Sequence, residues 1–113
     1  MYVARLPALN SLCNLQGVTR IVIKSFRHKG LERLFRSGAV HGVSSAHAAR
    51  LRLVLSNLDV AKSAHDMDLP GLRLHMLKGD RKDTWSVQVS ANWRVTFQFV
   101  RQHVEYVDYE DYH

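Results

Sequence analysis

The sequence has little cysteine and no long hydrophobic run. Its one cysteine, Cys13, cannot form a disulfide within the chain or a cysteine-based zinc site, which favours a reducing compartment. No stretch approaches the roughly 18 apolar residues that a membrane-spanning helix requires. Residues 1–17 are interrupted by an arginine, a proline and two asparagines, so no signal peptide is expected. We therefore expect a cytoplasmic protein that does not contact a membrane.

Motifs of two large hydrolase classes are also missing. The sequence has no HExxH or comparable motif that would place metal ligands on a helix, and no glycine-rich phosphate loop of the Walker type. A metal-dependent nuclease that uses His75, His113 and a carboxylate as ligands is a less favoured alternative, because such enzymes normally gather several carboxylates. We expect neither a metal nor another cofactor.

Acidic residues are outnumbered by basic ones. The chain has 16 Lys and Arg against 10 Asp and Glu, a formal net charge of +6. Residues 1–20 hold two arginines and no acid, so the rest of the chain still has 14 basic and 10 acidic residues. This charge favours an anionic partner such as RNA, DNA or an acidic protein, without choosing among them.

Two helices are expected in the first half of a single domain. The pattern predicts one helix near Lys29–Ser37 that ends at Gly38, where glycine suits the left-handed cap. A second helix is predicted from a cap at Ser44 or Ser45 to about Leu58. The apolar residues at helical spacing in this second segment are Ala48, Leu51, Leu55 and Leu58.

Period-two alternation dominates the second half and predicts strands. A short strand is also expected near residues 21–26, ahead of the helices. In the second half, His75 and Arg94 fall on the face opposite the apolar residues, and Arg94 shares that face with Thr96 and Gln98. Two helices followed by an antiparallel sheet make an α+β domain. The residues expected to face the core are Leu72, Leu74, Met76, Trp85, Val87, Val89, Trp93, Val95, Phe97 and Phe99.

The turn before the final strand, about Val104 to Tyr109, lacks residues that favour positive φ. It consists of Arg101, Gln102 and His103, none of which suits a tight primed turn. The sequence therefore predicts either a wider loop or a strained hairpin.

Four blocks of sequence, in this order, resemble the plasmid-maintenance killer proteins, the HigB branch of the RelE/ParE toxin superfamily. They are Val22–Leu31, Leu74–Arg81, Trp85–Val87 together with Asn92–Phe99, and Asp108–His113. The resemblance implies a toxin domain at residues 22–113, with residues 1–21 an upstream extension or arm. It also implies a small twisted antiparallel sheet with two N-terminal helices packed on one side.

The resemblance assigns functional residues within these blocks. His113 or His75 would transfer protons, since histidine titrates near neutral pH. Asp111 would orient an imidazole or accept a hydroxyl proton, and Tyr112 would stack on a base or contact the leaving oxygen. Cations would bind the scissile phosphate. The implied catalytic residues are His75, Lys78, Asp111, Tyr112 and His113, and the implied RNA-binding residues are Lys78, Arg81 and Arg94.

Each of these residues also has a simpler interpretation. Residues 78–83 form a charged, glycine-containing stretch that suits a solvated turn, and the Asp111–His113 end suits a polar tail. His75 could be an exposed strand residue, and Arg94 could pair with an acid instead of RNA.

What the resemblance implies about activity is a type II toxin that cleaves mRNA on the ribosome without a metal and so stops translation. The implied partners are a cognate HigA-like helix-turn-helix antitoxin, the ribosome and mRNA, with operator DNA bound only through the antitoxin complex. Two alternatives stay open: a ParE-like inhibitor of DNA gyrase, and an inactive homologue that only binds its antitoxin. Fold alone does not decide among them.

Overall fold

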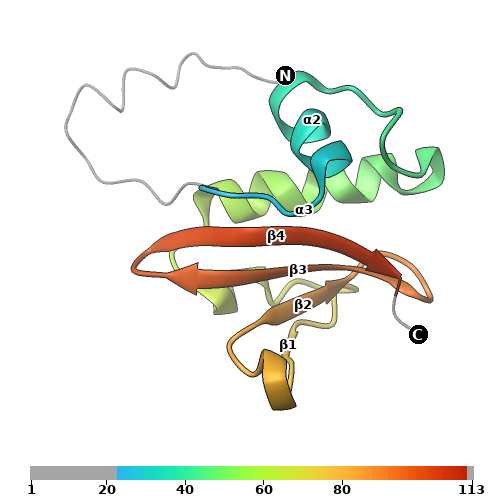
Figure 1. The fold of residues 1–113 in the computed structure, drawn as a ribbon. Coiled ribbons are helices and arrows are strands. Elements are labelled where there is room, and N and C mark those ends of the chain that lie inside the picture. Colours follow the sequence, from blue (N-terminus) through green and yellow to red (C-terminus); the bar gives the residue numbers. More distant parts are fainter. Residues whose placement is uncertain (1–22, 112–113) are drawn as a thin grey trace, which may run out of the picture.

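The computed structural model of the protein describes residues 23–111 (Figure 1). The expected extension at residues 1–21, and Tyr112 and His113 of the expected site, lie outside the described residues. The elements in chain order are α2 (Lys29–Ser37), η1 (Ser45–His47), α3 (Ala48–Val60), η2 (Ala64–Met67), β1 (His75–Met76), η3 (Gly79–Arg81), β2 (Trp85–Gln88), β3 (Trp93–Val100) and β4 (His103–Asp111), where η marks a 3-10 turn.

Helix α2 has the bounds that the sequence predicts. Its cap residue, His28, accepts a hydrogen bond at Nδ1 from the Leu31 amide at 3.0 Å. At the other end Gly38 adopts a φ of 79°, and its amide donates to the Leu34 carbonyl at 2.9 Å. The left-handed cap at Gly38 therefore ends the helix at the residue predicted from the sequence.

Helix α3 begins slightly later than predicted, because a 3-10 turn precedes it. Ser44 caps that turn and makes no side-chain capping bond, and α3 itself starts at Ala48. The predicted apolar stripe is confirmed, and Val54 joins it. The buried residues of α3 are Ala48, Leu51, Val54, Leu55 and Leu58.

The four strands form one antiparallel sheet in the order β1-β2-β3-β4. The segment before α2 runs parallel to β4 and joins it at two isolated bridges, Ile23 to Val104 and Phe26 to Val107. The described part of the predicted first strand is therefore two separate bridges and not a continuous strand.

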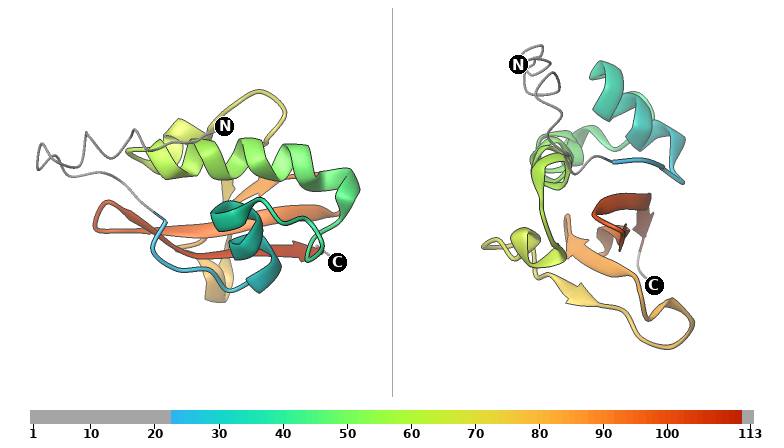
Figure 2. Two further views of the ribbon diagram at one scale, coloured as in Figure 1. Left: turned by 90° about the horizontal axis from the view of Figure 1, so that it is seen from above. Right: turned by 90° about the vertical axis from the view of Figure 1, so that its left-hand side faces the viewer.

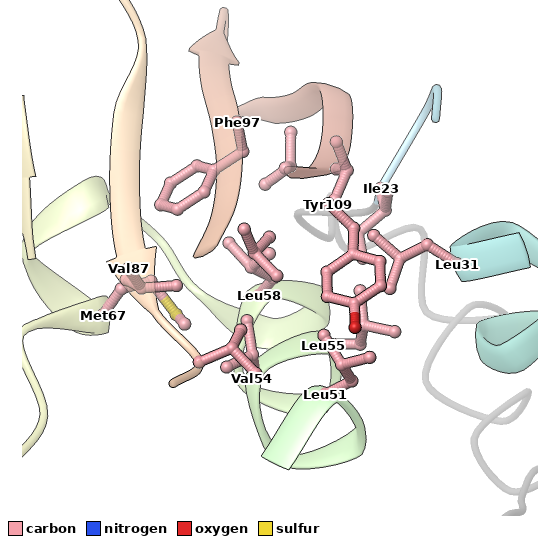
Figure 3. Close-up of a cluster of buried hydrophobic side chains, with 14 of the residues drawn as sticks. Ile23, Leu31, Leu51, Val54, Leu55, Leu58, Met67, Val87, Phe97 and Tyr109 are labelled. Atoms are coloured by element: carbon pink, nitrogen blue, oxygen red, sulfur yellow. The ribbon is translucent and has the colours of Figure 1, made fainter. Parts of the chain in front are cut away.

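Helices α2 and α3 lie on the same side of the sheet, which confirms the predicted α+β architecture (Figures 1 and 2). The core lies between these helices and the sheet (Figure 3). Burial of this apolar surface is the main force that holds the layers together. Its fully buried larger side chains include Leu31, Leu51, Leu55, Leu58, Met67, Leu72, Val87, Val95, Phe97, Val104 and Val107.

The prediction that Met76 faces the core is wrong. Its side chain is 44% exposed, although Leu72 is buried and Leu74 packs against the core. By register Met76 pairs with Trp85 and so shares the face of buried Phe97, but it lies on the short edge strand β1, at the margin of the core. Of the aromatic residues expected inside, Phe97 is fully buried, while Trp85, Trp93 and Phe99 are half-buried at the edge of the core.

The sequence predicted either a wider loop or a strained hairpin between β3 and β4, and the structure has the strained hairpin. Val100 pairs with His103, so Arg101 and Gln102 alone make the turn, with φ values of 54° and 78°. Two positive φ angles define a primed turn, which matches the twist of the strands but normally uses asparagine and glycine.

A β-bulge interrupts the pairing of β3 with β4. Thr96 pairs with Asp108, whereas Gln98 pairs with Glu105, and Tyr106 adopts a φ of 58° between them. A bulge shifts the alternation by one residue. Val104 and Tyr109 both face the core as a result, although an odd number of positions separates them.

No helix among residues 23–111 is both long enough and apolar enough to cross a membrane.

Candidate active site

Polar side chains gather on the face of the sheet that is turned away from α2 and α3. Residues paired across strands point to the same face, so the register defines two adjacent rows of side chains. The first row joins all four strands, and the second joins β2, β3 and β4. The first row is His75, Ser86, Thr96 and Asp108, and the second is Gln88, Arg94 and Glu110.

A hollow of about 500 Å³ on this face is lined by both His75 and Arg94, which the family resemblance assigns to the site. Ser86 and Gln88 form part of its wall, and Asn92 of the β2–β3 turn lines it as well. The structure therefore brings together an imidazole and a guanidinium that are 19 positions apart in the sequence.

His75 lies on an edge strand and is exposed. Its Nδ1 atom lies 3.1 Å from the Arg73 carbonyl oxygen, a contact in which Nδ1 is the donor when it carries the proton. This arrangement leaves Nε2 as the basic nitrogen of the neutral ring. An exposed imidazole with a fixed tautomer suits proton transfer to a ligand in the hollow.

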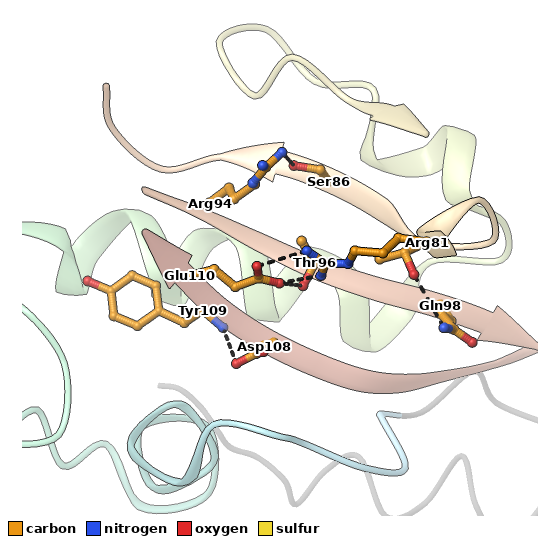
Figure 4. Close-up of polar contacts among 9 residues, drawn as sticks. Arg81, Ser86, Arg94, Thr96, Gln98, Asp108, Tyr109 and Glu110 are labelled. Atoms are coloured by element: carbon orange, nitrogen blue, oxygen red, sulfur yellow. Dashed lines mark hydrogen bonds and ion pairs between the residues drawn. The ribbon is translucent and has the colours of Figure 1, made fainter. Parts of the chain in front are cut away.

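Arg94 is more buried than a surface RNA contact would be, with 6% of the residue exposed. Its Nη1 donates to Ser86 Oγ at 3.4 Å (Figure 4), and its register partner on β4 is Glu110. Sequence alternation predicts the face on which Arg94 lies but not its burial. An arginine keeps its charge when buried, so Arg94 supplies a fixed positive charge in the wall of the hollow.

Glu110 joins two other residues of this face. Arg81 Nη1 donates to Glu110 Oε1 at 3.0 Å and Nη2 to Oε2 at 2.5 Å, while Thr96 Oγ1 donates to Oε2 at 2.7 Å (Figure 4). The bonds from Arg81 hold the pKa of the Glu110 carboxyl below its ordinary value, and Glu110 raises the pKa of Arg81. The Glu110 carboxylate therefore stays ionised and fixes the position of the Arg81 guanidinium.

Other predicted site residues are spread more widely. Lys78 is exposed and precedes η3, on the loop that also carries Arg81. Asp111 is exposed at the end of β4, where it pairs with Trp93. His75 on β1 and Asp111 on β4 occupy opposite edges of the sheet, and the row of His75 ends at Asp108, three residues before Asp111. The described residues thus unite His75 with Arg94 but do not bring Asp111 to them.

The end of β4 is anchored on the core side of the sheet. The Tyr109 hydroxyl lies 2.6 Å from His47 Nδ1, and the Tyr109 ring packs on Trp93 with centroids 4.5 Å apart. Burial raises the pKa of the Tyr109 phenol, which stays neutral. This packing fixes the backbone from which Glu110 and Asp111 project.

Sequence reasoning missed the roles of several polar residues. Glu110 lies within a motif block but received no role, and Ser86, Thr96 and Asp108 were not assigned to the site. Alternation of β3 and β4 offers a partial signal, since it places Thr96 beside Arg94 on one face. The contacts themselves depend on the register, which the bulge at Tyr106 shifts.

Within residues 23–111 no group of three or more His, Cys, Asp or Glu side chains is arranged to hold a metal ion. The metal ligand set considered from the sequence included His113, which lies outside this range.

Two helices on one face of a four-stranded antiparallel sheet, with cations and an imidazole on the other face, make up an arrangement that is consistent with the RelE-like class of toxins. Residues 24–113 match the family described as the RelE-like toxin of type II toxin–antitoxin system HigB, and the chain belongs to this family. It is also 44% identical to "Endoribonuclease HigB" of Proteus vulgaris over 92 residues, which are 81% of this chain and the full length of that relative.

Proposed function

We propose that this type II toxin is an endoribonuclease that cleaves mRNA on the ribosome without a metal ion, and so inhibits translation in the cytoplasm. The observation that carries the proposal is the hollow in which His75 and Arg94 meet on the open face of the sheet. The name of the Proteus vulgaris relative supports the endoribonuclease part of this proposal.

The chemistry proposed is attack by the ribose 2′-hydroxyl on the adjacent phosphorus. A base takes the 2′-hydroxyl proton, the bond from phosphorus to the 5′-oxygen breaks, and an acid protonates that oxygen. The products are a 2′,3′-cyclic phosphate and a free 5′-hydroxyl. Histidine suits both proton transfers because its pKa lies near neutral pH.

His75 is the described residue best placed for one of these transfers. Arg94 provides charge that stabilises the phosphorane, because it is fixed in the wall of the same hollow. We assign phosphate binding also to Lys78 and Arg81 of the loop after β1, where both side chains are exposed. By family resemblance, Asp111, Tyr112 and His113 supply the remaining acid–base and stacking groups.

The ribosome is proposed as a part of the active complex. A shallow face with few reactive groups depends on a substrate that is already bent and unstacked, which the decoding site provides. The proposed regulatory partner is a HigA-like antitoxin with a helix-turn-helix domain. Operator DNA would be bound only through the complex with that antitoxin.

Primer extension on a defined mRNA tests the proposal, with purified protein in the presence and absence of programmed ribosomes. His75→Ala and His113→Ala should each abolish cleavage. His41→Ala is the matched control, because His41 is exposed in the turn between α2 and η1, away from the polar face. Cleavage at codon-phased positions that requires ribosomes is the expected result for the unmodified chain.

The metal requirement needs a separate arm, because ribosomes themselves depend on magnesium. Complexes of ribosome and mRNA are formed first in magnesium. The toxin is then added together with a chelator. Unchanged single-turnover cleavage is expected, with a 2′,3′-cyclic phosphate at the new end. Intact mRNA in every lane from folded protein would contradict the proposal and direct the next assays to DNA gyrase and to antitoxin binding alone.

A further inference from the structure

Another hollow, of about 320 Å³, lies on the polar face near the middle of β4. We infer that it is a binding subsite for an unpaired RNA base that presents N–H donors, with guanine the best fit. The inference rests on the proposed function, because the base would belong to the same mRNA strand that crosses the His75 hollow. The aromatic side chain in its wall is Tyr106, the residue at the β-bulge.

Tyr106 is held in an unfavourable conformation that leaves its ring in the open. Its φ of 58° costs about 1–2 kcal/mol for a residue with a Cβ atom, and 42% of the residue is exposed. The amide of Tyr106 donates to Ser25 Oγ at 2.9 Å, and the next amide, of Val107, donates to the Ser25 carbonyl at 3.1 Å. Backbone strain held in place by neighbouring bonds is a feature of functional sites.

A cation lies over this ring. The guanidinium carbon of Arg27 lies 5.3 Å from the centroid of the Tyr106 ring, and both residues line the hollow. Aromatic rings and guanidinium planes are the surfaces on which proteins stack unpaired bases. Stacking on these surfaces stabilises any bound base and does not discriminate among the four bases.

The remaining wall favours a base over a phosphate group. Asp80 and Asp108 line the hollow and offset the charges of Arg27 and Arg81, so the lining has no excess of positive charge to attract an anion. The Asp108 carboxylate is held in position because its Oδ1 accepts from the Tyr109 amide at 2.9 Å. Carboxylates accept hydrogen bonds from N–H groups, and guanine offers two such groups side by side on its Watson–Crick edge.

Neutral groups complete the recognition chemistry. Gln98 Nε2 donates to Thr84 Oγ1 at 3.3 Å, and both residues line the hollow. This bond fixes the amide so that its carbonyl oxygen and its remaining N–H are available to a base edge.

The two hollows are adjacent, which relates this subsite to the cleavage site. Arg81 and Thr96 line the hollow of Tyr106, and both donate to Glu110. The register partner of Glu110 is Arg94, which lines the hollow of His75. From Glu110 to Tyr106 the strand spans about 13 Å, a length that a few nucleotides of a single strand can follow. The subsite would thus bind a base a few nucleotides from the scissile bond.

Nucleotide binding is tested by NMR, with isotope-labelled full chain titrated with guanosine 5′-monophosphate. The amide signals of Thr84, Gln98 and Tyr106 should shift, and cytidine 5′-monophosphate and inorganic phosphate should leave them nearly unchanged. Tyr106→Leu removes the ring and Asp108→Asn removes the anionic acceptor, and each should weaken binding about tenfold. Asp83→Asn, in the loop before β2 and outside the hollow, is the control and should bind as the unmodified chain does.

A cleavage assay provides the second readout, with mRNAs that differ only in the bases flanking the cleaved codon. Faster cleavage with guanine at one flanking position is expected, together with loss of that preference in Tyr106→Leu. Shifts that are equal for guanosine monophosphate and phosphate, or equal in both variants and the unmodified chain, would overturn the inference, as would no shift at all. If the unmodified chain cleaves no mRNA, the proposed function fails, while the titration still decides whether the base subsite exists.

Discussion

Arg81 and Glu110 form a two-bond ion pair that connects the loop after β1 to the last strand of the sheet, with N–O distances of 3.0 and 2.5 Å. The pair spans 29 positions of sequence. Arg81 bonds both carboxylate oxygens, and Thr96 adds a second hydrogen bond to Oε2. A phosphate that binds Arg81 must therefore share it with, or take it from, this carboxylate.

Glu110→Gln should lower the free energy of unfolding by about 1 kcal/mol at pH 7, because the pair is partly exposed and screened by water. The depressed pKa of Glu110 contributes stability above its ordinary value of 4.5, and this stability is lost as the pH falls through the lower pKa of the folded state. Urea denaturation of both proteins from pH 7 down to pH 3 measures the difference, which should shrink only on the acid side.

Glu32→Gln is the control for this series, because Glu32 pairs with Arg36 on the exposed surface of α2. It should change stability by only about 0.3–0.5 kcal/mol. A difference for Glu110→Gln that persists unchanged at the lowest pH would show that its carboxylate charge is not the cause.

Gly30→Ala should destabilise the fold by about 2 kcal/mol, although alanine is the better helix former. A Cβ atom at residue 30 would lie 2.2 Å from the carbonyl oxygen of Gly42, so α2 would have to move away from the loop that precedes η1. Thermal and urea unfolding measure the effect. Gly38→Ala is the comparison: no atom lies within 4 Å of its Cβ position, so only its positive φ opposes the change.

Replacing Arg101 by Asn and Gln102 by Gly should stabilise the protein by about 1–2 kcal/mol, because both residues adopt positive φ. The turn lies at the end of the β3–β4 hairpin, at the opposite end from Trp93 and Asp111. Cleavage activity should therefore be unchanged. A loss of stability in urea denaturation would contradict the two-residue primed turn.

Arg94→Lys should reduce cleavage about a hundredfold, the usual effect of losing a fixed donor at a developing negative charge. Lysine keeps a positive charge but cannot reproduce the planar guanidinium that reaches Ser86, and burial lowers the pKa of its ammonium group. Single-turnover cleavage on ribosomes measures the rate. Arg52→Lys is the control, since Arg52 is exposed on α3, and circular dichroism verifies folding in both variants.

Local patterns predicted the helices and most of the core because each depends on residues close in sequence. The bounds of α2 follow from its cap at Gly38, and the buried stripe of α3 follows from helical spacing. Met76 was mispredicted because alternation indicates only the face of a strand, and the position of Met76 on the edge strand β1, at the margin of the core, depends on the order of the strands.

The site was harder to predict because its contacts depend on strand register. Alternation placed His75 and Arg94 on the polar face, but their shared hollow requires that β1 pair with β2 and β2 with β3 in one alignment. The ion pair of Arg81 with Glu110 also requires the bulge at Tyr106, which no short motif specifies.

The bulge at Tyr106 has a consequence for how the gene tolerates mutation. Along β4, successive codons serve different needs: Tyr109 packs in the core, and its neighbours Asp108 and Glu110 face the site. A comprehensive substitution library should therefore divide into two alternating classes, one in which the variants lose folded protein and one in which they keep folded protein but lose toxicity. The bulge at Tyr106 adds one residue to the strand, so the two classes should exchange odd and even positions there.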